Sequence, residues 1–125
     1  MLKMHVLTKR ADFLKAARAR RQGTAGFTLQ ARARTPEEAA RVDPDLVRVG
    51  FTCSKKVGNA VARNRAKRRL REVARALLPE GGRPGFDYVL IGRAGATAER
   101  EFGALLNDMR YALRRVHEAP REKRG

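Results

Sequence analysis

The sequence has few of the residues from which covalent, redox or metal sites are built. Cys53 is the single cysteine among 125 residues, so no disulfide can form within the chain. The two histidines, His5 and His117, lie far apart, and no cysteine–histidine cluster has zinc-site spacing. A glycine-rich loop of the P-loop type is absent. We therefore expect no cofactor or metal on the chain, surface histidines, and Cys53 as a small buried apolar residue in a reducing cytoplasm.

Acidic residues and long apolar runs are also scarce. The chain has 13 Asp and Glu against 29 Lys and Arg, a net charge of +16. The longest apolar run, residues 88–91, is too short to span a bilayer, and the first ten residues lack a signal-peptide core. Hydrophobic residues make up 42%, as in folded proteins. We expect one cytoplasmic domain over residues 1–119, a frayed basic tail over 120–125, and a polyanionic partner rather than a membrane.

Apolar periodicity predicts an α+β fold, a single two-layer sandwich in the order α-β-β-α-β-α with room for an extra short strand. Strands are expected at Phe27–Ala33, at residues 46–53 and at Phe86–Gly92. The first has Phe27, Leu29 and Ala31 on its apolar face, and we expect it to pair antiparallel with the second. Phe86–Gly92 is almost continuously apolar, which indicates a central strand buried on both faces.

Three helices are expected around these strands. The first covers residues 8–21, with Thr8 as its N-cap. The second covers residues 59–78, capped by Asn59 and closed by Pro79 and Gly81–Gly82. The last begins after Thr97 as its N-cap. The second helix carries an apolar stripe of Ala66, Leu70, Val73, Ala74 and Leu77, and the last carries Ala98, Phe102, Leu105, Leu106, Met109, Leu113 and Val116. Residues 35–44, with two prolines, are expected to form an exposed loop.

The second helix belongs to a segment of one-signed charge. Residues 55–75 hold nine Lys and Arg and one acid, Glu72. Arg63, Lys67 and Arg71 are four apart, so they line one ridge and repel one another unless phosphates neutralise them. Because a solvated helix face normally mixes its charges, this segment favours a nucleic-acid contact over a merely solubilising surface.

The stretch SKKVGNAVARNRAKRRLRE, residues 54–72, resembles the signature of the bacterial ribonuclease P protein subunit. Shorter similarities flank it: residues 48–51, residues 88–91 with Arg93, and Asp12 and Phe13 with Phe27. Together they cover nearly the whole chain at the length typical of that family.

The resemblance implies a fold and a role that spacing alone does not give. In that family the catalyst is an RNA that uses Mg²⁺, and the protein holds the 5′ leader of precursor tRNA and supports the active RNA fold. Its fold has an unusual left-handed βαβ crossover, as in a domain of a small-subunit ribosomal protein. The chain would therefore be a non-catalytic subunit that joins the RNA in a 1:1 complex and is monomeric when free.

The resemblance also implies residue roles. The positions expected to contact the catalytic RNA are Lys55, Lys56, Gly58, Asn59, Arg63, Asn64, Arg65, Lys67, Arg68 and Arg71. Those expected in the cleft that takes the leader are Phe13, Ala17, Thr28 and Gln30. Relatives often carry rings where Ala17 and Gln30 stand here, so part of a stacking energy of about 1–3 kcal/mol per base is lost and leader binding leans on phosphate contacts. By periodicity alone, Phe13 fits a core position at least as well as a stacking platform.

Two other functions are compatible with the composition. One is a structural RNA-binding protein of ribosome or ribonucleoprotein assembly. The other is an autonomous protein nuclease, which needs convergent carboxylates that the scattered acids of this sequence do not suggest.

Overall fold

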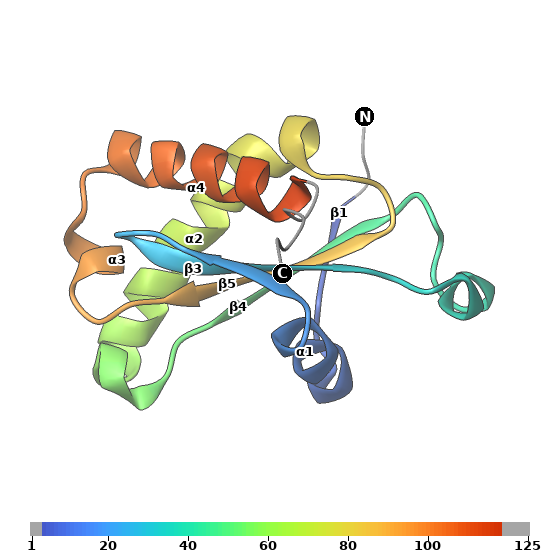
Figure 1. Cartoon of the computed structure of the whole chain (residues 1–125). Helices are drawn as coiled ribbons and strands as arrows, with labels where there is room; N and C mark the ends of the chain where they lie inside the picture. The colour runs from blue at the N-terminus through green and yellow to red at the C-terminus, as the bar shows by residue number, and fades with distance from the viewer. Residues whose placement is uncertain (1–3, 119–125) are drawn as a thin grey trace, which may run out of the picture.

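The computed structural model describes residues 4–118, which form one five-stranded sheet with helices on both faces (Figure 1). The strand order is β1-β4-β5-β3-β2; β1, β4 and β5 run parallel, and β3 is antiparallel to both β5 and β2. In chain order the elements are β1 (Met4–Val6), α1 (Arg10–Ala17), β2 (Arg20–Gly23), β3 (Phe27–Ala33), the 3₁₀ turn η1 (Pro36–Ala40), β4 (Val47–Thr52), the 3₁₀ turn η2 (Lys55–Val57), α2 (Ala60–Gly81), β5 (Phe86–Gly92), α3 (Ala96–Glu99) and α4 (Phe102–His117). The expected tail, residues 120–125, lies outside the described residues.

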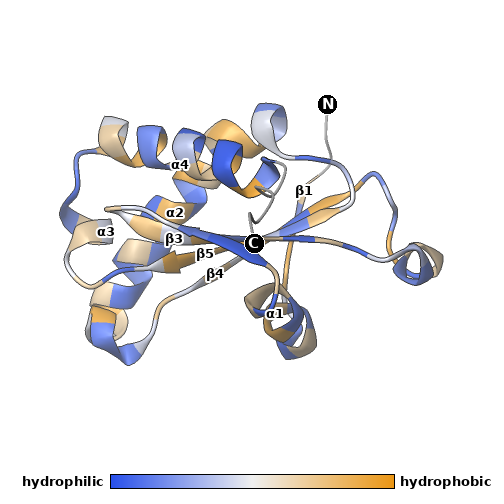
Figure 2. Cartoon of the chain, viewed as in Figure 1, coloured by the Kyte–Doolittle hydropathy of each residue, from blue (hydrophilic) through white to orange (hydrophobic). Residues whose placement is uncertain are grey.

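The main core lies between the sheet and the helices α2 and α4, which cover one face of it (Figure 1). Both helices alternate hydrophilic and hydrophobic residues along their length (Figure 2), as amphipathic helices on a sheet must. The shorter α1 lies on the opposite face, where a smaller cluster joins Leu7, Ala16 and Val89 to Phe13 and Ile91. No helix within residues 4–118 combines the length and the apolar character that crossing a bilayer requires.

Several sequence predictions are confirmed. The strands Phe27–Ala33 and Phe86–Gly92 have the expected bounds, and β5 is the central strand, buried toward both helix layers. Asn59 caps α2, since its Oδ1 accepts a hydrogen bond from the Ala62 N–H at 2.9 Å. The expected stripe of α2 faces the core, except that Leu78 is fully buried in place of the half-buried Leu77.

The predicted first helix is too long. It ends at Ala17, and Arg20–Gly23 forms the edge strand β2, because hydrogen bonding to β3 outweighs the helical propensity of this arginine-rich segment. Thr8 does not cap the helix; Lys9 stands at the N-cap and makes no side-chain cap bond.

The predicted pairing of β3 with β4 is wrong. β5 lies between them, because α2 carries the chain back so that β5 adds parallel to β4 and antiparallel to β3. Alternation identifies the buried face of a strand but not its neighbour. The β4–α2–β5 segment is a parallel βαβ unit.

Three smaller predictions also fail. Pro79 does not end α2, because a proline so near the C-terminus removes only one backbone bond; the helix continues to Gly81 with Gly82 as its C-cap, so only the glycine pair ends it as predicted. Thr97 does not cap the last helix; it is buried in α3, where its hydroxyl donates to the Gly26 carbonyl and accepts from the Arg93 N–H, at 2.5 and 2.7 Å. The loop at residues 35–44 contains η1, whose Glu38 is buried.

Candidate RNA-binding surfaces

A groove of about 440 Å³ opens between α1 and the sheet. Three of the four predicted cleft residues line it: Phe13 and Ala17 from α1, and Gln30 from β3. Thr28 is not part of the lining, although it pairs with the lining residue Ile91 across β3 and β5. The rest of the lining is Thr8, Arg10, Phe51, Thr52, Val89 and Ile91. We call this feature the α1 groove.

Phe13 is both a packing residue and part of the groove wall. It is half-buried, contacts the small cluster under α1, and still lines the opening. Its ring lies so close to the sheet that a Cβ on Gly50 would be 2.5 Å from Phe13 Cε1. A glycine at position 50 therefore allows the ring to rest on β4, and the core and platform interpretations of Phe13 both hold in part.

Three arginines near the groove were not assigned to it from the sequence. Arg10 lines it, one helical turn before Phe13. Arg21 pairs with Gln30 across β2 and β3, so its side chain leaves the same face of the sheet. Arg93 approaches Thr28, with Nη2 3.4 Å from the threonine Oγ1. Arg21 was missed because its segment was predicted as helix, and Arg93 was noted only as part of the resemblance.

The basic ridge, defined as Arg63, Lys67 and Arg71 of α2, lies along the side of the helix next to β4. The Arg71 guanidinium lies 5.7 Å from the centre of the Phe51 ring, and Phe51 also borders the α1 groove. Both Arg63 and Lys67 act electrostatically on Cys53, just beyond β4. The ridge and the groove therefore meet at the end of β4.

The remaining predicted RNA-contact residues surround the start of α2. Lys55 and Lys56 are exposed in η2, whose first turn is capped by Ser54. Gly58 has φ of +140°, and a Cβ there would be 2.8 Å from that of Ala62, so this turn requires glycine. Of the predicted contact residues on α2 itself, those that are exposed are Asn64, Arg65, Arg68 and Arg71.

None of the predicted basic contact residues takes part in an ion pair within residues 4–118. By contrast, their neighbour Arg69 is structural: it donates hydrogen bonds to the carbonyls of Thr97 and Ala98, at 3.0 and 2.8 Å. Unpaired like charges on one helix form a surface suited to a polyanion.

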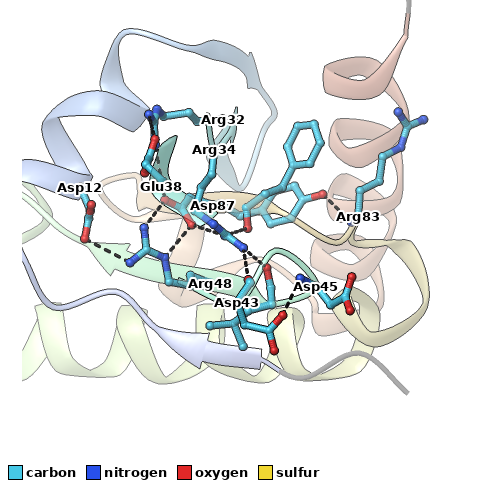
Figure 3. Close-up of polar contacts among 12 residues, drawn as sticks. Asp12, Arg32, Arg34, Glu38, Asp43, Asp45, Arg48, Arg83 and Asp87 are labelled. Carbon is cyan, nitrogen blue, oxygen red and sulfur yellow. Dashed lines mark hydrogen bonds and ion pairs between the residues drawn. The ribbon is translucent and has the colours of Figure 1, made fainter. Parts of the chain in front are cut away.

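A buried carboxylate, that of Asp87, accepts hydrogen bonds from arginines that come from other parts of the chain (Figure 3). Asp87 of β5 is 0% exposed and accepts two hydrogen bonds from Arg48, at 2.8 and 2.7 Å, and one from Arg34 at 2.8 Å. Arg48 also reaches Asp12 of α1 at 3.4 Å, which ties the groove wall to the sheet. We call these four residues the Asp87 network. The sequence offered no signal for it beyond an acid inside an apolar strand.

A second ion pair adjoins this network, since Arg32 Nη1 also lies 3.8 Å from Asp87 Oδ2. Arg32 binds Glu38 of η1 through both carboxylate oxygens, at 3.2 and 2.5 Å. The bonds from Arg32 lower the pKa of Glu38 to about 2, despite burial, which acts in the opposite direction. The same bonds raise the pKa of Arg32.

The expectation of a surface histidine is wrong for His117. It is half-buried at the end of α4, and its Nε2 lies 2.6 Å from the hydroxyl of the buried Tyr88. Burial, aided by the charges of Arg83 and Arg20, lowers the pKa of His117 to about 4, while burial raises that of Tyr88 to about 12. Within residues 4–118 no three His, Cys, Asp or Glu side chains are grouped so that they could hold a metal ion.

Known proteins share this sequence and architecture. The family model described as Ribonuclease P matches residues 1–117. The Ribonuclease P protein component of Ruegeria pomeroyi is 66% identical over 112 residues, which are 90% of this chain and 86% of that protein. That of Paramagnetospirillum magneticum is 50% identical, over 88% of this chain and 80% of its own length.

Solved structures agree with the sequence relatives. The RNase P protein of Staphylococcus aureus superposes with a TM-score of 0.68 at 25% identity, over 90% of this chain and 94% of that one. The fold alone is also shared with the RNase P protein of Thermotoga maritima, at 23% identity and a TM-score of 0.68, over 87% and 94% of the two chains. The chain belongs to the bacterial ribonuclease P protein family, the RNA-binding subunit of a tRNA-processing ribonuclease.

Proposed function

We propose that the two surfaces of this subunit bind two different RNAs. The α1 groove takes the single-stranded 5′ leader of precursor tRNA, and α2 with η2 contacts the catalytic RNA. The observation that supports this most is their junction: Phe51 borders the groove on one side and lies under Arg71 of the basic ridge on the other. A leader leaving the groove at β4 therefore passes directly to the surface that binds the ribozyme.

The chemistry of cleavage belongs to the RNA in this proposal. The Mg²⁺ that drives hydrolysis is held by the catalytic RNA, and this chain contributes affinity and charge screening between two polyanions. Each phosphate that the protein neutralises lowers log K by about 0.7–0.9 per tenfold rise in salt. We infer a 1:1 complex with the RNA, because one groove and one ridge serve one leader and one ribozyme.

The groove fits a leader bound more through phosphates than through stacked rings. Phe13 is the one aromatic residue that α1 contributes to it, and Arg10 lies one turn away on the same helix. Arg21 lies beside Gln30 on the same face of the sheet, and Arg93 approaches Thr28 on β3. A salt series of leader affinity tests this point, since a shallow dependence on salt would contradict it.

The proposed function is tested by cleavage of precursor tRNA at low Mg²⁺, where the catalytic RNA alone is slow. The protein alone, the RNA alone and the two together are compared. We expect cleavage at the mature 5′ end with both components and little with either one. Tight binding to a different RNA without rescue of cleavage would instead favour a structural role in ribonucleoprotein assembly. Cleavage by protein free of RNA would refute the division of labour.

A further inference from the structure

Arg93, the first residue after β5, presents an exposed charge at the edge of the α1 groove. Ile91, two residues before it, lines the groove and pairs with Thr28 across β3 and β5. The Arg93 Nη2 lies 3.4 Å from the Thr28 Oγ1, and within residues 4–118 Arg93 takes part in no ion pair. An arginine without an acidic partner can donate its N–H groups to a phosphate at this point.

Gly23 leaves the space in which that guanidinium lies. It pairs with Thr28 across β2 and β3, and a Cβ at position 23 would be 2.9 Å from the Arg93 Nη2. The φ of Gly23 is not positive, so alanine can adopt the same backbone conformation. A larger residue here would therefore displace the far end of the flexible Arg93 side chain rather than disturb the sheet.

Thr97 fixes the backbone of the same arginine. Its side chain is fully buried; the hydroxyl accepts a hydrogen bond from the Arg93 N–H at 2.7 Å and donates one to the Gly26 carbonyl at 2.5 Å. Gly26 lies in the turn between β2 and β3, so one hydroxyl ties Arg93 to the hairpin that carries Gly23. Arg69 of α2 donates in turn to the Thr97 carbonyl at 3.0 Å, which holds α3 in place.

We propose that Gly23 and Thr97 are positioning residues, which hold Arg93 where its guanidinium binds a phosphate of the leader. A long side chain loses rotamer freedom when a ligand orders it, and one that is already held near its bound position loses less. Ordering one such side chain weakens affinity by about two- to tenfold, so the two residues together contribute a factor of this size. The inference rests on the proposed function and adds to it two residues that act through Arg93.

The test measures the leader ratio, defined as the affinity of the holoenzyme for precursor tRNA divided by its affinity for mature tRNA. Gly23→Ala displaces the guanidinium and leaves Thr97 intact, Thr97→Val removes both hydrogen bonds of the hydroxyl, and Thr97→Ser keeps them. Each variant is made alone and together with Arg93→Ala, and melting curves of the protein follow its stability. Thr24→Val is the matched control, because the Thr24 hydroxyl also donates one bond and accepts one in this turn, both with Phe27, at 2.6 and 3.1 Å.

We expect Gly23→Ala and Thr97→Val each to lower the leader ratio by about two- to tenfold, and neither to lower it further once residue 93 is alanine. Thr97→Ser and Thr24→Val should keep the wild-type ratio, and Arg93→Ala should lower both the ratio and its salt slope, the latter by about 0.7.

An additive loss would overturn the inference, because a merely structural role for Thr97 leaves the effect of Arg93→Ala unchanged. A wild-type ratio in Gly23→Ala, or an unchanged salt slope in Arg93→Ala, would overturn it too. Should Thr97→Val fail to fold, Gly23→Ala still decides whether the position of Arg93 matters. A leader ratio near one in the wild type would overturn the proposed function as well.

Discussion

Replacing Asp87 by asparagine should be among the most damaging isosteric changes in this protein. The substitution keeps the shape of the side chain and removes its charge. Arg48 and Arg34 would then point three charge-assisted hydrogen bonds, now 2.7–2.8 Å long, at a neutral amide. Half of that amide is itself a donor, so at least one arginine N–H loses its acceptor beside a fully buried side chain.

The expected loss of stability is about 3–5 kcal/mol, the range found when one partner of a buried ion pair is removed. That is a large share of the roughly 5–15 kcal/mol by which a domain is stable. The loss should also reach the α1 groove, because Arg48 is the residue through which Asp12 ties α1 to the sheet.

Urea unfolding measures the effect, read as a shift of the midpoint at an unchanged slope. The control is Glu118→Gln, which breaks the ion pair with Arg115, where both side chains are 43% exposed. That variant should change stability by less than about 1 kcal/mol, as solvent-exposed pairs do. If Asp87→Asn cost no more than this control, the argument that the buried network anchors the sheet would be refuted.

Three further predictions follow from neighbouring or buried side chains. Arg68→Ala should weaken binding to the catalytic RNA and lower the salt slope of that binding by about 1 without changing the melting temperature of the protein. Arg69→Ala should instead lower the melting temperature, because Arg69 donates hydrogen bonds to two carbonyls of α3. The reverse pattern would contradict both roles. His117, with its pKa lowered to about 4 by burial, binds a proton more readily when unfolded. Its contribution to stability is therefore complete above pH 6.5 and is lost as the pH falls from 6.5 toward 4, so unfolding of His117→Gln should depend less on pH than wild type in this window, and identical profiles would exclude the effect. Burial raises the pKa of the Cys53 thiol, so a thiol reagent should modify it slowly in the native protein and quickly in urea; fast native labelling would show that the position is open.

The sequence predicts well those features that depend on nearby residues. The alternation of β3 gives its bounds and its buried face, and Asn59 marks the start of α2, because both signals lie within a few residues of what they determine. The basic ridge is equally local, since three residues spaced by four must share one side of a helix. Of the groove, Phe13, Ala17 and Gln30 were anticipated through the family resemblance rather than through periodicity.

Features that depend on distant residues escaped prediction. Asp87 is 39 residues from Arg48 and 53 from Arg34, so nothing near it in sequence distinguishes a network centre from an isolated acid. The first half of β2, Arg20 and Arg21, was predicted as helix because the stability of this strand comes from pairing with β3 rather than from its own residues. The position of β5 between β3 and β4 is likewise set by the packing of α2, which alternation does not report.

Under the proposed function, in which the chain binds two RNAs, the junction at Phe51 has a thermodynamic consequence. The Arg71 guanidinium lies 5.7 Å from the centre of the Phe51 ring, and residue 51 also lines the groove. Occupancy of one surface thus bears on a residue that also borders the other. Whatever free energy links the two is reciprocal: the factor by which the ribozyme changes affinity for the leader is the factor by which the leader changes affinity for the ribozyme. The precursor tRNA and the catalytic RNA would then each change the affinity of this subunit for the other, rather than bind to it independently.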